Sequence, residues 1–341
     1  MINDFQEEVT TRREILKNQI KGASGKCSML MLILGLLSQG IGILAGVGLA
    51  AYSMINGTLN MNDGNYMYGV NKEFINIVLG ITPCIVVDII IILIGLKTTK
   101  LKLKRDIFNK SNYSKKIIPL GMASVGGVLL ISTTIYLFYS AVIKFMGLTI
   151  PAPDFTFPSS TLMRVMYISY ICILGPILEE IIFRGILLKS MKKYGAFTAI
   201  IFTSIVFSMF HLNLVQFMTP LLLGILLAFV TVNANSIIPA IIIHMFNNSM
   251  ATVITCVAGE SELVSTIIST VFIFGGVIGL IFFINQYKND IKRIIKEDHK
   301  LLPFRKKLGY CFSNGWSVGY IIFYVTFILI NFVYINVLSQ M

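Results

Sequence analysis

Two adjacent carboxylates and a downstream arginine are the first residues of this sequence whose spacing could support chemistry. They form the segment Glu179-Glu180-Ile-Ile-Phe-Arg184. On an α-helix, residues four positions apart share a face, so Glu180 and Arg184 can form an ion pair. Glu179 is rotated by about 100° from Glu180 and is free to face another group. The two carboxylates are therefore expected to have different environments, an arrangement that separates protonation roles at acid–base sites.

Two histidines and an asparagine follow these carboxylates along the chain. His211 ends the motif Phe207-Ser-Met-Phe-His211, and His244 begins the motif His244-Met-Phe-Asn247-Asn248. His244 and Asn248 are again four residues apart and share a helix face. The Asn248 amide could donate a hydrogen bond to an anion, or it could orient a histidine ring nitrogen. Imidazoles and carboxylates are the usual groups of general acid–base catalysis.

The elements that position these residues are predicted to be membrane-spanning helices. The chain has 341 residues, of which 55% are hydrophobic and 13% are charged, and its mean hydropathy is +0.80. Soluble proteins average about 25% charged residues, so the composition excludes a water-soluble globule. About nine apolar segments are long enough to suggest spans, although the fifth and sixth are short: roughly 28–55, 75–96, 117–143, 161–188, 197–213, 217–233, 236–258, 265–284 and 313–338. We expect an all-α polytopic transmembrane helix bundle of about eight or nine spans with a four-helix catalytic core.

The apolar segments divide the chain into four predicted regions. These are a cytoplasmic N-terminal segment at 1–27, accessory transmembrane helices at 28–143, a catalytic helical core at 161–258 and C-terminal transmembrane helices at 265–341. The last region contains a basic cytoplasmic loop at 285–309. The first 27 residues are charged and irregular, without the immediate apolar run of a cleavable signal peptide. The whole chain is therefore expected to be mature protein.

The distribution of basic residues predicts the orientation of the bundle. Of the 28 Lys and Arg residues, 24 lie in the N-terminal segment and in alternate loops at 97–116, 189–196 and 285–309. The positive-inside rule places these segments in the cytoplasm, and nine spans would then put the C-terminus outside. The basic loops are expected to contact anionic lipid headgroups. The net charge of +12 does not indicate a nucleic-acid partner, because no folded basic domain with groove-reading elements is evident.

Ionisable residues inside apolar segments are informative because each costs several kcal/mol on membrane insertion scales. Five of the six such residues lie in 161–258, and the exception, Asp88, has no partner nearby in sequence. Asp88 is therefore interpreted as a structural residue, for example a helix cap or an interhelical donor. The third histidine, His299, lies in a basic loop and is expected to be solvated. Small residues around Gly126 and Gly127 predict close helix packing.

The depth of the candidate residues follows from the helical rise. Glu179 and His211 each lie about 22–24 Å along a helix from the turn near Gly195, so two antiparallel helices would bring them to one level. His244 is shallower in its own span, and kinks at nearby prolines could close the difference. Taken singly, each residue also has a structural interpretation: Glu180 and Arg184 could be a buried ion pair, and a lone polar residue often joins two membrane helices.

The three motifs resemble those of the CAAX protease and bacteriocin-processing family (CPBP, or Abi) of intramembrane glutamic endopeptidases. That family is similar to the type II CAAX prenyl endopeptidases. Its pattern is Glu-Glu-x-x-x-Arg, then Phe-x-x-x-His, then His-x-x-x-Asn or Asp on successive helices, and this sequence matches it in order and spacing. The likeness covers about 165–255, whereas 1–160 and 260–341 carry no assigned motif and exceed the minimal family core.

The resemblance implies an endopeptidase of a bacterial plasma membrane that hydrolyses a peptide bond with glutamate-activated water. Processing of a peptide and self-immunity to a bacteriocin are roles that the family suggests. Glu179 would act as the general base on a water molecule held with His211. His244 and Asn248 would stabilise the oxyanion, as side-chain donors do at developing negative charge.

The resemblance further implies that Glu180 and Arg184 position Glu179 and tune its protonation. No cofactor is implied. A zinc site is the chemical alternative, because two histidines and one glutamate can form an open three-ligand site, although the His-Glu-x-x-His pair is missing. Membrane lipid and a protein or peptide substrate are the expected partners.

Two other functions remain open on the sequence alone. The first is a non-catalytic, membrane-embedded protein that confers immunity or binds a membrane signalling partner through the same polar cluster. The second is a transporter that uses the carboxylates and histidines as a proton relay. No inverted repeat is evident to support a transporter.

Overall fold

The structure is a computed structural model that describes residues 2–58, 66–67, 69–109, 111–153, 156–298 and 302–337. His299 and the last residues of the region 265–341 lie outside the described residues. The elements are α1 (Ile2–Ile55), β1 (Tyr66–Met67), β2 (Val70–Asn71), α2 (Lys72–Ile75), η1 (Asn76–Ile81), α3 (Thr82–Thr99), η2 (Leu103–Ile107), α4 (Ile117–Phe145), α5 (Thr161–Ser169), η3 (Tyr170–Leu174), α6 (Gly175–Glu180), η4 (Ile181–Leu188), α7 (Lys189–Lys192), α8 (Ala196–Phe210), α9 (Met218–Ala234), α10 (Ile238–Glu260), α11 (Glu262–Asp298), α12 (Phe304–Phe312) and α13 (Gly315–Asn336), where η denotes a π-helical segment.

The described chain confirms the predicted all-α polytopic bundle. Six helices are long and apolar enough to cross a membrane: α1 from Thr10 onward, α3, α4, α10, α11 and α13. The two apolar helices α8 and α9 are shorter, as their sequence segments indicated, and the fourth predicted span is the interrupted helix α5 to α7. Besides the helices, the described residues contain a two-residue antiparallel hairpin of β1 and β2. Large apolar side chains project from the long helices, as a lipid-facing surface requires, among them Leu44, Phe138 and Phe274.

Residues 2–27 are not irregular, and this expectation from the sequence was wrong. They are the first half of α1, which continues without a break into the first span. Ion pairs along one helix face support the charged half: Arg12 Nη2 lies 2.6 Å from Glu8 Oε1, and Lys17 Nζ lies 3.0 Å from Glu14 Oε2. Pairs at these spacings stabilise helices by a few tenths of a kcal/mol each, so a charged segment can still be helical.

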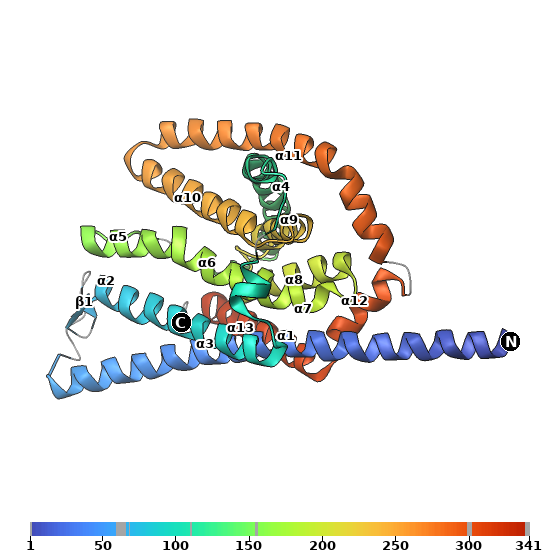
Figure 1. Cartoon of the computed structure of the whole chain (residues 1–341). Coiled ribbons are helices and arrows are strands. Elements are labelled where there is room, and N and C mark those ends of the chain that lie inside the picture. Colours follow the sequence, from blue (N-terminus) through green and yellow to red (C-terminus); the bar gives the residue numbers. More distant parts are fainter. Residues whose placement is uncertain are drawn as a thin grey trace.

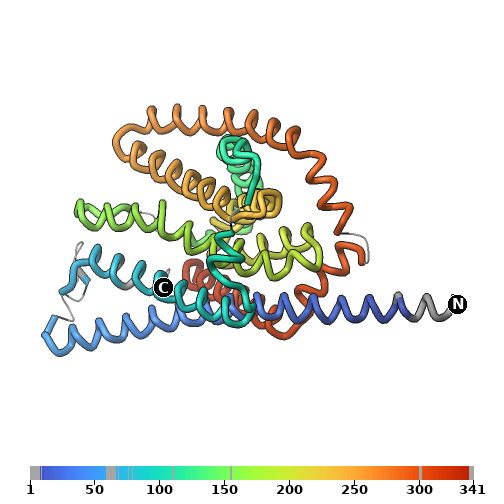
Figure 2. The backbone as a smooth tube through the Cα atoms, viewed as in Figure 1, coloured from blue at the N-terminus to red at the C-terminus, as the bar shows by residue number. Residues whose placement is uncertain are grey.

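The ends of the helices and the loops gather at two opposite ends of the bundle (Figure 1). The N-terminal half of α1 and the C-terminal end of α11 lie at one end, while the hairpin, the start of α5 and the turn between α10 and α11 lie at the other. The tube in Figure 2 shows that α5 to α7 run through the interior of this arrangement, with α1 and α3 on one side and α10 on the other. The interrupted helix is therefore surrounded by the elements that carry the other candidate residues.

Close packing of α4 on α11 depends on small residues, as the sequence predicted. A Cβ atom added at Gly127 would lie 2.6 Å from the carbonyl oxygen of Gly276, which is too close for a real side chain. Ser124 on α4 also lies 3.4 Å, as a hydrogen-bond donor, from the carbonyl oxygen of Gly279. Small residues at a helix interface let the backbones approach, which is how membrane helices gain packing contacts without a hydrophobic driving force.

Candidate active site

The helix that carries Glu179 and Glu180 alternates between α and π geometry. The π-helical segments η3 and η4 flank the short helix α6, which ends at Glu180 and contains Pro176 near its start. A proline removes one backbone donor, and π-helical turns occur frequently at functional sites because they re-aim side chains. The change of pitch at Ile181 falls between Glu180 and Arg184, so it sets the orientation of these two side chains relative to each other.

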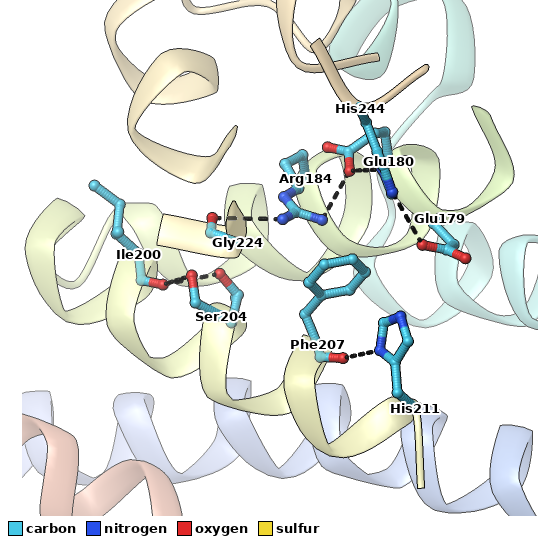
Figure 3. Close-up of polar contacts among 10 residues, drawn as sticks. Glu179, Glu180, Arg184, Ile200, Ser204, Phe207, His211, Gly224 and His244 are labelled. Atoms are coloured by element: carbon cyan, nitrogen blue, oxygen red, sulfur yellow. Dashed lines mark hydrogen bonds and ion pairs between the residues drawn. The ribbon is translucent and has the colours of Figure 1, made fainter. Parts of the chain in front are cut away.

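The ion pair predicted between Glu180 and Arg184 is present and completely buried. Arg184 Nη1 donates to Glu180 Oε1 over 2.9 Å, and the two side chains are 1% and 0% exposed. A second guanidinium nitrogen of Arg184 lies 3.4 Å from the carbonyl oxygen of Gly224 on α9. The arginine therefore joins the carboxylate helix to α9 as well as neutralising one of the two carboxylates (Figure 3).

His244 on α10 lies between the two carboxylates. Its Nδ1 atom is 2.9 Å from Glu180 Oε1, and its Nε2 atom is 3.8 Å from Glu179 Oε2. Figure 3 shows the ring bridging the two glutamates. The shallower depth that the sequence indicated for His244 does not separate it from them. The hydrogen bond at Nδ1 fixes the orientation of the imidazole and directs its other nitrogen toward Glu179.

Glu179 and Glu180 differ in exposure, as their rotation on the helix predicted. The Glu179 side chain is 18% exposed, whereas that of Glu180 is completely buried. Each carboxylate keeps one buried oxygen, Oε2, that has no hydrogen-bond partner among the described residues. Buried polar atoms are normally hydrogen bonded. Of the two, only Glu179 belongs to a partly exposed side chain, so its Oε2 is the acceptor that a water molecule or a bound substrate can reach.

His211 follows the last residue of α8 and is held by the backbone of that helix. Its Nδ1 atom lies 3.0 Å from the carbonyl oxygen of Phe207, so Nδ1 carries the hydrogen and donates it. The neutral ring then has Nε2 as an acceptor, and Figure 3 shows the ring on the same side of Phe207 as Glu179. The structure thus brings the end of α8 to the level of the carboxylates, as the helical rise suggested.

The ring of Phe207 separates and orients the charged groups. The Arg184 guanidinium carbon lies 4.4 Å from its centroid, a cation–π contact, and the His211 and His244 rings meet it edge-on at 5.1 and 5.9 Å. Desolvated contacts of the first kind contribute about 2 kcal/mol. The phenylalanine of the second motif therefore packs the arginine and both histidines in fixed positions.

Asn248 makes neither of the contacts that the sequence suggested. Its Nδ2 atom donates to the carbonyl oxygen of Ile171 over 2.7 Å, and its Oδ1 atom accepts from Asn247 Nδ2 over 2.9 Å. The bond to Ile171 links α10 to η3, where a carbonyl oxygen of the π-helical backbone accepts from the Asn248 side chain. Asn248 lies one helical turn from His244 with its amide committed to the backbone in this state.

Asp88 is a further candidate residue of the site, although the sequence analysis gave it only a structural role. It lies on α3, is 4% exposed, and interacts electrostatically with Glu179 and with the neighbouring Cys84. The packing of α3 against α6 brings these residues together although 91 positions separate them in sequence. An ionisable residue in a membrane span was the available signal.

These contacts do not decide whether the site works without a cofactor, as the sequence analysis expects. Within the described ranges, no three His, Cys, Asp or Glu side chains lie close enough together to hold a metal ion. That the site works without a metal stays a prediction and needs a chelation experiment.

Comparison with known proteins gives a match over the segment that carries the polar cluster. Taken together, the fold and the cluster define a multi-pass membrane protein with a buried site of two carboxylates, an arginine and two histidines. Residues 161–250 match the family described as Type II CAAX prenyl endopeptidase Rce1-like. No curated protein and no solved structure matches the chain. The match covers the segment from α5 into α10 and supports the assignment of this segment to the CPBP and CAAX protease family that the three motifs indicated.

Proposed function

We propose that this protein is an intramembrane endopeptidase that hydrolyses a peptide bond with a water molecule activated by Glu179. The observation that carries the proposal is the unequal pair of carboxylates inside the matched segment. Glu180 is neutralised by Arg184 at 2.9 Å, while Glu179 is partly exposed and faces His244 at 3.8 Å. One carboxylate is thus available for proton transfer and the other is held in a fixed ion pair.

The reaction begins with a water molecule between Glu179 and His211. Glu179 accepts a proton from the water as its oxygen attacks the peptide carbonyl carbon, and Nε2 of His211 accepts the second hydrogen bond of that water. A tetrahedral oxyanion forms. Glu179 then returns the proton to the amine nitrogen as the carbon–nitrogen bond breaks, which leaves a carboxylic acid and an amine and restores the site.

The oxyanion needs donors that are already in place. His244 serves this role when both of its ring nitrogens carry a hydrogen: Nδ1 donates to Glu180 Oε1 over 2.9 Å, and Nε2–H faces the reacting atoms. Asn248 joins it when its amide leaves the carbonyl oxygen of Ile171. Removal of one such donor typically costs about a hundredfold to a thousandfold in rate.

Glu180 and Arg184 position the other groups without touching the substrate. Glu180 holds the His244 ring through Nδ1, and Arg184 holds Glu180 and stacks on Phe207. Hydrogen bonds from supporting residues orient reacting groups in this manner at many active sites.

The setting proposed for this activity is a bacterial plasma membrane with the N-terminus in the cytoplasm. The concentration of basic residues in alternate loops supports that orientation. Maturation of a peptide and self-immunity to a bacteriocin are the proposed roles, with a small protein or peptide as substrate. Binding of a membrane signalling partner is the non-catalytic alternative.

Comparative peptidomics of membranes tests the proposal. Cells with the wild-type protein are compared with cells carrying Glu179→Gln, which keeps the side-chain shape and removes the base. Glu260→Gln, at the exposed end of α10, is the matched control. We expect one or more peptide products to disappear only in Glu179→Gln. Products and phenotype that persist in Glu179→Gln, with the protein inserted normally, would replace the protease by the binding function.

A further inference from the structure

A cavity of about 400 Å³ lies directly beside the proposed site. His211 and Phe210 form part of its wall, together with Cys84 of α3. The remaining wall comes from α1, from α13 and from the loops at 151–153 and 212–214. Its volume is within the range of about 300–1,000 Å³ that is usual for ligand sites. His211, which is proposed to hold the attacking water, therefore lines this cavity.

Two helical walls of the cavity lie outside the segment that matches the protease family. That segment is 161–250, whereas the walls are residues 31–39 of α1 and 320–331 of α13. The two helices are fixed to each other by a buried hydrogen bond of 2.8 Å between the hydroxyls of Ser28 and Ser317. At Gly35, a Cβ atom would lie 2.8 Å from Phe323 Cζ, so the glycine allows the close approach. This wall is a rigid pair of helices that belongs to this chain rather than to the family core.

The lining of the cavity is uncharged. None of its residues is Lys, Arg, Asp or Glu, and its polar side chains are hydroxyls and amides, apart from His211. Ser38 and Gln39 are adjacent on α1, and neither makes a side-chain hydrogen bond to another described residue. Asn331 of α13 also lines the cavity, with Nδ2 donating to the carbonyl oxygen of Phe327. Free amide and hydroxyl groups on an apolar wall suit the backbone of an extended peptide, which offers one donor and one acceptor per residue.

We propose that this cavity binds the part of the peptide substrate next to the scissile bond, and that it selects an uncharged, mainly apolar segment. The inference rests on the proposed endopeptidase function and adds the substrate class to it. A charged side chain of the substrate would enter a largely apolar space whose lining offers no Lys, Arg, Asp or Glu as a counter-ion. Selection then depends on α1 and α13, which lie outside the segment that matches the family, as well as on the end of α8.

The experiment is a charge swap in the cavity. The substrates are synthetic peptides built on the cleavage sequence from the membrane peptidomics, with Leu, Asp or Lys at each position beside the scissile bond. The enzymes, in liposomes, are the wild type, Gln39→Glu, Gln39→Ala and the control Gln19→Glu, which lies at an exposed position on the same helix. We expect the wild type to cleave Lys and Asp peptides at least about tenfold more slowly than the Leu peptide at one or more positions. Gln39→Glu should recover the Lys peptide alone, and Gln19→Glu should behave as the wild type.

A second variant of the cavity keeps the proposal testable if Gln39→Glu does not fold. Ser38→Phe reduces the volume of the cavity with an apolar group and should raise KM about tenfold while kcat falls less. Equal cleavage of Leu, Asp and Lys peptides by the wild type, or an unchanged preference in both Gln39→Glu and Ser38→Phe, overturns the cavity proposal. Retention of a lipid by the cavity in native mass spectrometry, with peptide preference unaffected by these variants, overturns it too. Cleavage that survives Glu179→Gln instead refutes the proposed function, so the two failures are distinguishable.

Discussion

Replacement of Arg184 by Leu tests the buried ion pair that organises the site. The guanidinium is 1% exposed and neutralises a carboxylate that is 0% exposed, so solvent does not screen the pair. Removal of one partner of a buried pair typically costs about 3–5 kcal/mol, because the remaining charge is left without compensation. Arg184→Leu also loses the bond to the carbonyl oxygen of Gly224 and the contact with Phe207. We therefore expect a clear loss of thermal stability.

The same substitution should lower activity by on the order of a hundredfold. Glu180 holds His244 at 2.9 Å, and a displacement of about 1 Å at a reacting group costs about that factor. Thermal unfolding in detergent measures the first effect, and cleavage of the identified peptide in liposomes measures the second.

The double variant Glu180→Leu with Arg184→Leu separates stability from catalysis. Replacement of a whole buried pair by apolar residues is often neutral or stabilising, so the double variant should recover much of the stability lost in Arg184→Leu. Its activity should stay low because His244 has lost its partner. Full activity in Arg184→Leu would refute the positioning role of the pair, and a double variant less stable than Arg184→Leu would refute the electrostatic account.

The remaining predictions concern the metal, the orientation and the loop before α5. Cleavage should be unchanged after treatment with a chelator; loss of activity that added zinc restores would identify a metalloprotease. Single cysteines in 97–116 and 285–309 should react with membrane-impermeant reagents only after the membrane is opened, and labelling of intact cells would reverse the orientation. Hydrogen bonds from Ser159 and Ser160 hold the pKa of the Glu73 carboxyl below its ordinary value of 4.5. Because that pKa is lowered, the contact is complete above about pH 4.5 and is lost as the pH falls through the lower folded value. Hydrogen exchange at Ser159 and Ser160, corrected for intrinsic rates, should rise in acid for the wild type, and an equal acid response in Glu73→Gln would contradict this origin.

Local spacing was sufficient for several features of the protein. The apolar lengths predicted the helices, since the hydrocarbon thickness sets how many residues a span needs. The four-residue interval predicted the Glu180–Arg184 pair, because i and i+4 share a face on any α-helix. Glycines at 126 and 127 predicted the close packing of α4 on its neighbour, since only small residues allow it. These features depend on the residues of one segment and on the solvent around it.

Other features depend on which helices become neighbours, and local spacing carries no information about that. His244 meets both carboxylates because α10 packs beside α6, and Asp88 lies within electrostatic range of Glu179 because α3 also packs against α6. The hydrogen bond of Asn248 to Ile171 depends on the π-helical backbone of η3, which no periodicity of the sequence indicated. The continuous helix α1 was missed because charge was taken for irregularity.

The cavity illustrates the same division at the level of function. The motifs in 161–250 were enough to recognise a protease family, because reacting groups must recur in a fixed order and spacing. The uncharged walls from α1 and α13 come from opposite ends of the chain, and only their packing against the end of α8 encloses a volume beside His211. The chemistry of the site was thus readable from local residue types. The space in which a substrate lies was decided by tertiary packing, because a cavity belongs to several segments at once.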